Sequence, residues 1–428
     1  MRRVVPALGF VVACAHQGAP PSAAAAPANP PLDVAAFDEA ARDGWERFLR
    51  HDYPGAARSY ERALSANPGD DVVLYLLALA SLRAGDSTAA MDRLARLAEL
   101  GSDLVPREDH FHDLAARPAF RAVVLRTSAS AARHRRSSEA FRVPEKGLLA
   151  EGIAFDPVEP AFYIGSVRRR KIVKLVAGQA PVDFVSSHLE VDAVGGLRID
   201  VRRRRLWAVS SADSRMDGFA ENDRGRNALL EFELATRKLV GLYRLTSSGE
   251  HSLNDVALDA KGRPFVTDTA SGQIYTLAAD GRSLEPLFDI PPFLYPNGIT
   301  FDDEGRWMFV GDATGVVRVD VATRKTLRLL QPQGMTLLFF DGLYFVRSDA
   351  GPRLVGVQIV AGPGRVVSAA LNPALDAVVR TEILESNHPA FDAPTTGAVV
   401  GSRFFFIANS QQWVPHEPAE TIILTTPL

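Results

Sequence analysis

The amino-acid sequence predicts an all-β six-bladed β-propeller preceded by a small, all-α helical domain. Two kinds of internal repeat carry this prediction. One is helical with a period of 34 residues, and the other consists of alternating apolar residues, typical of strands, and recurs six times from Glu151 onward. The chain has 428 residues, of which 46% are hydrophobic and 23% charged, so it can bury a core in each unit.

The first residues have the pattern of a targeting segment. Two arginines precede the apolar run Val4–Ala13, which is too short to span a bilayer. The only cysteine, Cys14, follows this run, and the arrangement resembles the lipobox of bacterial lipoproteins, in which the cysteine is lipidated. We therefore expect residues 1–13 to be a lipoprotein signal peptide and residues 14–34, rich in Ala and Pro, to be a flexible tether. The expected location is the bacterial cell envelope, lipid-anchored at the outer membrane; a secreted or periplasmic protein is the alternative.

The helical domain is expected over residues 35–128. Alanines where paired helices cross would let those helices approach closely, and the spacing resembles that of tetratricopeptide repeats. Two repeats are fewer than an independent solenoid needs, so we expect the domain to pack on its own closing helix or on the propeller. It is either a peptide-binding groove or, as we favour, a structural or tethering module. The repeat pairs are Gly44/Ala78, Ala56/Ala90, Tyr60/Leu94, Ala63/Leu97 and Pro68/Ser102.

Residues 129–138 predict a linker, and residues 139–428 the propeller. Each of six segments begins with a polar or small residue, continues with alternating apolar residues, and reaches a second apolar strand after a turn. The starts lie 43 to 59 residues apart, which suits four-stranded blades. We expect the ring to close by pairing residues 139–143 with residues 421–425. The six starts are Glu151, Gly195, Asn254, Asn297, Asp341 and Thr396.

Four of these six positions carry side-chain oxygens, and none is His or Cys. The first strand of each blade lies nearest the propeller axis, so equal register brings these side chains to one point. The carboxylates of Glu151 and Asp341, with the amide oxygens of Asn254 and Asn297, form a hard-oxygen set that suits calcium. Zinc would be expected to recruit His or Cys. The competing interpretation is that Asn or Asp before Gly only makes a turn at a strand entry.

The motifs at four starts are Glu151-Gly152, Leu253-Asn254-Asp255-Val256, Pro296-Asn297-Gly298-Ile299 and Asp341-Gly342-Leu343. Together they resemble the senescence-marker-protein/gluconolactonase family of regucalcin-like propellers and, more distantly, the paraoxonases. The resemblance covers residues 151–412. It implies that Glu151, Asn297 and Asp341 bind a divalent cation, usually calcium. It further implies that Asn254 lies beside the metal and the substrate, and that Asp341 is the catalytic base.

The fifth blade departs from the family pattern, which often has Pro-Asp-Gly-Met. Here Phe340 precedes Asp341, and an alternative alignment on residues 332–335 would replace the aspartate by Gln333. We prefer Asp341 because an apolar strand pattern follows it. The step from Asn297 to Asp341 also repeats the spacing from Asn254 to Asn297.

The resulting expectation is a divalent-metal-dependent hydrolase of lactones or related esters, in which the cation polarises the carbonyl and Asp341 is the base. His251 could assist, although a lone His in a loop is usually solvated. Asp268 and Asp312 are expected to cap turns rather than to line the site.

Two other functions compete with this one. The alternative is a non-enzymatic propeller that binds a ligand or protein, with a structural metal and helical repeats that recruit a partner. A metal-free strictosidine-synthase-like propeller is disfavoured by the ring of oxygens. A formal net charge of −3 gives no field suited to nucleic acid, and no aromatic platform accompanies the basic runs, so no nucleic-acid partner is expected. Contact with a membrane is expected through the lipid anchor only.

Overall fold

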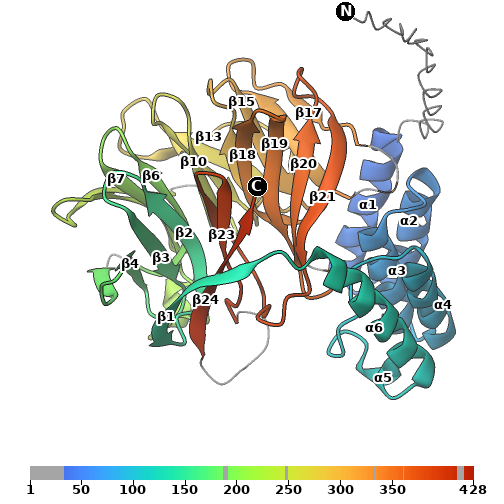
Figure 1. Ribbon diagram of the computed structural model, residues 1–428. Coiled ribbons are helices and arrows are strands. Elements are labelled where there is room, and N and C mark those ends of the chain that lie inside the picture. Colours follow the sequence, from blue (N-terminus) through green and yellow to red (C-terminus); the bar gives the residue numbers. More distant parts are fainter. Residues whose placement is uncertain are drawn as a thin grey trace, which may run out of the picture.

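The computed structural model describes residues 33–186, 191–245, 249–331, 334, 336–359, 361–411 and 419–428. The expected signal peptide with Cys14, most of the tether and Gln333 lie outside the described residues. The described chain forms a group of helices beside a propeller (Figure 1). Within it, no helix combines the length and the hydropathy needed to cross a bilayer.

The helical unit begins each of its first four helices after an aspartate. Asp33, Asp52, Asp70 and Asp86 each accept a hydrogen bond from the backbone N–H three residues later, which satisfies an otherwise unpaired donor at the helix start. The unit consists of α1 (Val34–Leu49), α2 (Tyr53–Ala66), α3 (Asp71–Arg83), α4 (Ser87–Glu99), α5 (His112–Ala115), α6 (Pro118–Ala131) and the 3₁₀ turn η1 (Ala132–His134).

The linker expected at residues 129–138 is partly helical. Helix α6 continues to Ala131 and η1 follows it, so only three residues separate the helices from β1 (Ser138–Lys146). Burial explains the extension, because Thr127 and Ala131 are fully covered by the rest of the protein. Alanine is also the best helix former among the residues of this segment.

The described strands form six four-stranded antiparallel sheets, the blades of the predicted propeller. In blades 1 to 5 the strands follow one another along the chain from the axis outward. Blade 1 contains β2 (Ala150–Asp156), β3 (Ala161–Ser166), β4 (Lys171–Val176) and β5 (Val182–Val185), and blade 2 contains β6 (Ala193–Asp200), β7 (Arg205–Ser211), β8 (Asn227–Glu233) and β9 (Leu239–Arg244). Blade 3 contains β10 (Leu253–Leu258), β11 (Pro264–Asp268), β12 (Gln273–Leu277) and β13 (Leu284–Pro286), and blade 4 contains β14 (Ile299–Phe301), β15 (Trp307–Asp312), β16 (Gly315–Asp320) and β17 (Thr326–Arg328). Blade 5 contains β18 (Phe340–Ser348), β19 (Gly351–Gln358), β20 (Arg365–Leu371) and β21 (Val378–Ser386).

The sixth blade closes the ring as predicted. It contains β22 (Gly397–Val400), β23 (Arg403–Ile407), β24 (Glu420–Pro427) and, as its outermost strand, β1 from the start of the propeller. Val143 pairs with Thr421 and Glu139 with Leu424. One blade thus combines strands from both ends of the propeller sequence, and this pairing closes the ring of blades.

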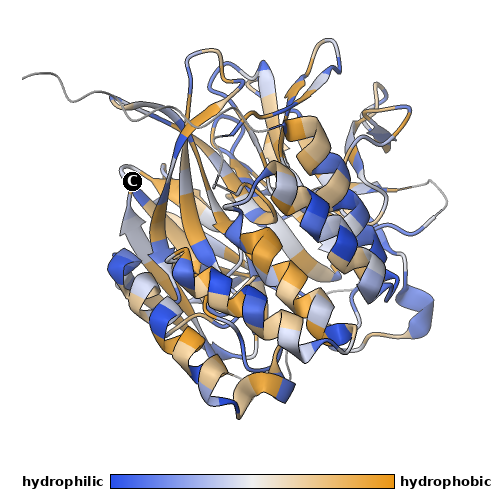
Figure 2. Cartoon of the chain, turned by 90° about the vertical axis from the view of Figure 1, so that its right-hand side faces the viewer, coloured by the Kyte–Doolittle hydropathy of each residue, from blue (hydrophilic) through white to orange (hydrophobic). Residues whose placement is uncertain are grey.

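The helical unit shares a hydrophobic core with the propeller, as one of the two expected packings requires. Helix α3 is buried continuously from Val72 to Ser81, which is typical of a helix covered on all sides. Its cluster includes Leu338 and Phe339 of the propeller. Seen from the helical side, hydrophilic and hydrophobic residues mix on the outward helices (Figure 2). The apolar face of the repeats therefore points toward the propeller.

Candidate metal site

The inner strands of four blades carry a bulge at the predicted site position. The regular pairing of β2 with β3 is interrupted between Ala150 and Ile153, the interval that contains Glu151. Equivalent interruptions contain Gly195 in β6, Asn254 in β10 and Asp341 in β18. A bulge re-aims side chains out of the regular alternation.

A second backbone feature precedes the site in four blades. Leu149, Tyr295, Phe339 and Ala393 have φ between 48° and 57°, a left-handed conformation that is uncommon for residues other than glycine. Each stands two positions before a residue that lines a cavity at the entry of the inner strands. These lining residues are Glu151, Asn297, Asp341 and Thr395. The sequence alignment had placed Thr396 at this position in blade six, so it was wrong by one residue. The hydroxyl of Thr396 instead donates to the backbone carbonyl of Glu151.

The four oxygen-bearing residues predicted from the repeats lie in one cavity. Glu151, Asn254, Asn297 and Asp341 all line a hollow of about 220 Å³ at the entry of the inner strands. Asp341 is 5% exposed, whereas the other three are half-buried. The described residues contain no cluster of three or more His, Cys, Asp or Glu that could hold a metal, so a cation here would depend on the mixed carboxylate and amide set.

Close approach between blades explains the glycines that follow the site residues. A Cβ on Gly152 would lie 2.0 Å from the carbonyl oxygen of Gly195 in the next blade. A Cβ on Gly298 would lie 2.6 Å from the backbone nitrogen of Leu343. The glycines therefore permit dense packing at the axis, and neither has a left-handed backbone. The competing interpretation was that Asn or Asp before Gly only makes a turn at a strand entry. It does not describe the conformation of these glycines.

The two carboxylates of the cavity interact. Burial raises the pKa of Asp341 to about 8, the charge of Glu151 adds to the increase, and a hydrogen bond from the side chain of Asn297 opposes it. A carboxyl in this position binds a proton at neutral pH unless another positive charge replaces that proton. Arg215 of the same cavity interacts electrostatically with Glu151, and a cation bound beside Asp341 would favour the charged form of that carboxyl.

The amide groups leave their oxygens for a ligand. The Asn254 side-chain nitrogen donates to the hydroxyl of Thr269 at 3.1 Å, and Asn297 donates to Asp341. The Oδ1 atom of Asn297 is buried and has no hydrogen-bonding partner in the described structure. Leaving a buried acceptor unpaired costs about 1–3 kcal/mol. A hard cation beside Asn297 would remove this cost, so the residues present fit calcium.

A half-buried arginine links several blades further along the inner strands. Arg198 of β6 donates to the carbonyl of Val256 at 3.1 Å, and its guanidinium lies 5.3 Å from the centroid of the Tyr344 ring. Burial raises the pKa of the neighbouring Asp255 to about 6, and the charge of Arg198 limits that increase. Arg198 thereby connects blades 2, 3 and 5 next to the candidate metal site.

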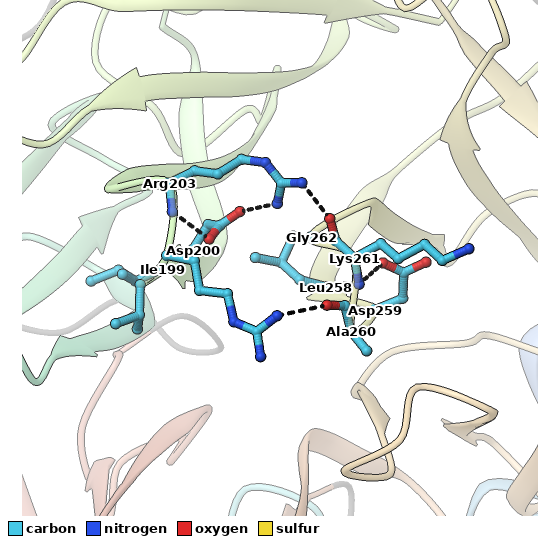
Figure 3. A pocket seen from close by; sticks show the side chains of 10 residues that line it. Ile199, Asp200, Arg203, Leu258, Asp259, Ala260, Lys261 and Gly262 are labelled. Atoms are coloured by element: carbon cyan, nitrogen blue, oxygen red, sulfur yellow. Dashed lines mark hydrogen bonds and ion pairs between the residues drawn. The ribbon is translucent and has the colours of Figure 1, made fainter.

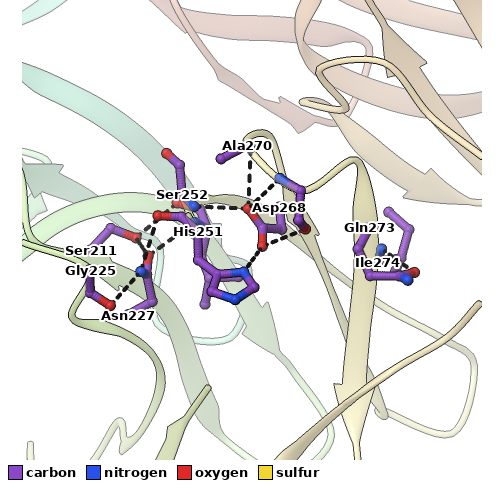
Figure 4. A network of polar contacts seen from close by, with 11 residues as sticks. Ser211, Gly225, Asn227, His251, Ser252, Asp268, Ala270, Gln273 and Ile274 are labelled. Atoms are coloured by element: carbon purple, nitrogen blue, oxygen red, sulfur yellow. Dashed lines mark hydrogen bonds and ion pairs between the residues drawn. The ribbon is translucent and has the colours of Figure 1, made fainter. Parts of the chain in front are cut away.

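His251 and Asp268 form a local network rather than part of the cavity wall (Figure 4). The Nδ1 atom of His251 lies 2.6 Å from Oδ2 of Asp268. The same carboxylate accepts hydrogen bonds from the backbone of Ser252 and the hydroxyl of Ser271. Asp268 therefore anchors the chain just before Asn254 and caps a turn, as expected. His251 is buried against it rather than solvated, with a side-chain exposure of 8%.

Asp312 also serves structure rather than the cavity. Its carboxylate accepts hydrogen bonds from both terminal nitrogens of Arg328, at 2.7 and 3.1 Å, and from the backbone of Thr314. Arg328 in turn contacts Asp38 of α1 at 2.9 Å. The capping role predicted for Asp312 is found, and it extends to the contact between the propeller and the helical unit.

Repeat alignment missed the loop residues that line the cavity. Arg215 and Asp213 come from the connection between β7 and β8, and Arg215 donates two hydrogen bonds to Asp213, at 2.8 and 2.6 Å. This connection has no counterpart in the repeat pattern, so the sequence offered no signal for it. Its polar side chains give the cavity a hydrogen-bonding wall.

A larger hollow lies at the opposite end of β6 and β10 (Figure 3). It has a volume of about 690 Å³ and lies between two hairpin turns. Arg203 donates to Asp200 at 2.8 Å and to the carbonyl of Lys261 at 2.6 Å. None of the predicted site residues lines this hollow. The smaller cavity at the strand entries is therefore the candidate site.

Comparisons with known proteins find one family match, which lies in the helical unit. Residues 48–117 match the family model of the tetratricopeptide repeat. No curated protein matches the chain in sequence. A solved gluconolactonase from Xanthomonas campestris is similar, with 15% identity over 67% of this chain and 88% of its own, at a TM-score of 0.47.

Other solved propellers are similar to the same degree. The PQQ-bound aldose sugar dehydrogenase from Streptomyces coelicolor has 12% identity over 68% of this chain and 97% of its own, with a TM-score of 0.46. Virginiamycin B lyase from Staphylococcus aureus has 12% identity over 68% of this chain and 88% of its own, with a TM-score of 0.44. Similarities this low say nothing about the activity of this chain, whose six blades are established by its own sheet topology.

Proposed function

We propose that the chain is a calcium-dependent hydrolase of small polar lactones or related esters. The observation that carries this proposal is the buried Oδ1 of Asn297, which has no partner in the described structure and lies in the same cavity as Glu151, Asn254 and Asp341. Oxygen donors without His or Cys favour calcium among the common protein-bound cations. Glu151, Asn297 and Asp341 would hold the ion, with Asn254 beside it.

The proposed reaction uses a bound ion, one carboxylate base and two polar side chains of the cavity. When bound, the ion would supply Lewis acidity to the substrate carbonyl. Asp341 would accept the proton of the attacking water while the carbon–oxygen bond of the ester breaks, and would return that proton to the leaving alkoxide. A lactone would thus open to a hydroxy acid. Arg215 and Asp213 would orient polar groups of the substrate, and a cavity of about 220 Å³ limits the substrate to a small molecule.

Hydrolysis of a lactone panel tests this proposal. The metal-stripped protein should be inactive, calcium should restore activity, and Asp341→Asn should lower kcat at least about a hundredfold, since general-base catalysis contributes on that order. The matched control is Glu304→Gln, an exposed carboxylate away from the cavity, which should keep full activity. Hydrolysis that survives both chelation and Asp341→Asn would reject the mechanism.

A non-enzymatic propeller is the second candidate, and the tetratricopeptide match is the observation that favours it. In that case the ion would be structural, and the helical unit would recruit a protein partner. It predicts calcium binding without hydrolysis of any member of the panel. Substrate turnover by the wild-type protein would exclude it.

A further inference from the structure

We propose that the helical unit positions two of the candidate metal ligands, Asn297 and Asp341, and that it acts through Trp45 of α1. The proposal rests on the metal-dependent function above and gives the helical unit a role in it. A positioning residue of this kind touches neither the ion nor the substrate. It fixes the backbone that carries the ligands.

Trp45 packs against the two residues that lead into those ligands. Its ring centroid lies 4.8 Å from that of Phe339 and 6.3 Å from that of Tyr295, with interplanar angles of 64° and 88°. Such edge-to-face pairs stabilise the rings beyond the effect of burial alone. Tyr295 and Phe339 stand two positions before Asn297 and Asp341. A single side chain of the helical unit thus contacts both entry segments.

Both entry residues have a backbone that needs support. Tyr295 has φ of 53° and Phe339 has φ of 56°. A non-glycine residue in this conformation is strained and persists where its surroundings fix it. The backbone of Phe339 is held by hydrogen bonds with Asp312 and Ile359, at 3.1 and 3.2 Å. Trp45 packs on the ring of Phe339, so removing Trp45 would let the backbone of Phe339 leave its left-handed conformation.

A buried polar network fixes the same segment from α3. Arg365 of β20 donates to both carboxylate oxygens of Asp71, each at 3.1 Å, and to Asp103 at 2.7 Å. Arg365 also donates to Oε1 of Gln358 at 2.6 Å, and the amide of Gln358 donates to the carbonyl of Leu338 at 2.6 Å. The chain of contacts therefore runs from the helical unit to the residue before Phe339.

These contacts also occupy the face that the repeats turn toward the propeller. Helix α3 is covered there, and Leu338 and Phe339 belong to the core of the helical unit. The segment that leads to Asp341 thus lies on the face of the repeats that packs against the propeller. The repeats hold a segment of their own chain.

The test uses the full-length protein and three variants. Trp45→Ala removes the contact with both entry segments, and Trp45→Phe restores an aromatic ring. Phe120→Ala is the control for loss of an aromatic ring from the helical unit, because Phe120 is more deeply buried than the half-buried Trp45 but packs on Phe111 rather than on the propeller. Hydrogen–deuterium exchange follows the amides of residues 294–299 and 336–343, and calorimetry with calcium chloride measures metal affinity.

In Trp45→Ala we expect severalfold faster exchange in both segments and a calcium affinity roughly tenfold weaker, the lower end of what loss of an outer-shell support costs. Trp45→Phe should recover most of both, and Phe120→Ala should change neither. Exchange in Trp45→Ala equal to that of the wild type would overturn the positioning role. A wild type that takes up no calcium would instead reject the proposed function, while the exchange data still decide whether Trp45 holds the two segments.

Discussion

The side chain of Asn297 donates a hydrogen bond to the carboxylate of Asp341, and its own Oδ1 is buried without a partner in the described structure. The two residues belong to neighbouring blades and are 44 positions apart in the sequence. One amide thus stabilises a carboxylate and keeps an oxygen available beside it. This relationship is the basis for the candidate calcium site.

Calcium affinity should rise with pH. Burial, with the charge of Glu151, raises the pKa of Asp341 to about 8 in the metal-free protein. The proton must leave before the carboxylate can accept a cation, so binding strengthens as the pH rises toward about 8 and releases protons below it. Calorimetry at pH 7 in buffers with different ionisation enthalpies measures this release. An affinity that stays constant between about pH 6 and pH 9 would contradict the protonated state of Asp341.

Gly152→Ala should destabilise the propeller and weaken the metal site. The new methyl group would meet the carbonyl of Gly195 at 2.0 Å, so two inner strands must separate. Overpacking of this kind costs about 1–3 kcal/mol in unfolding free energy. Gly178→Ala is the control. Gly178 has φ of 76° and open space around it, so the new methyl group meets no atom and only the strained backbone conformation should lower the unfolding free energy. If both variants bind calcium equally well, close packing next to Glu151 is not needed for the site.

Asp70→Asn should flatten the pH dependence of stability. Asp70 caps α3 through the N–H of Val73 at 2.9 Å, and burial raises its pKa from 3.8 to about 7. The folded protein keeps a proton that the unfolded chain releases, so this contribution is complete below about pH 4 and is lost as the pH rises through 7. Asparagine can keep the cap without titrating.

Denaturant unfolding at several pH values measures this effect. The wild type should lose more stability than Asp70→Asn between about pH 4 and pH 8. Asp86→Asn changes the exposed cap of α4 in the same way and should follow the wild type. Parallel curves for all three proteins would mean that Asp70 does not hold a proton in the folded state.

Strand periodicity was sufficient to predict the blades and to bring four oxygen-bearing residues to one cavity. Alternating apolar residues recur in all six inner strands, and aligning them placed Glu151, Asn254, Asn297 and Asp341 in register. The pairing of β1 with β24 was also predictable, because the propeller needs a partner for its last strand. These features depend on local pattern and on ring closure alone.

Other features depend on contacts that no local pattern encodes. Thr395 lines the cavity in place of Thr396, two positions after the left-handed Ala393, and alanine gives no signal for that conformation. Arg215 lies on a connection outside the repeat. The contact of Trp45 with Phe339 joins residues 294 positions apart, so only the folded chain reveals that the helical unit reaches the site.

Calorimetric titration of calcium chloride into the metal-stripped, full-length protein tests the central claim most directly. We expect one calcium ion per wild-type chain, with binding weakened at least about tenfold in Asn297→Ala and in Glu151→Gln, and unchanged in Glu304→Gln. Absence of calcium binding in the wild type, or equal binding in all four proteins, would contradict the assignment of the metal site.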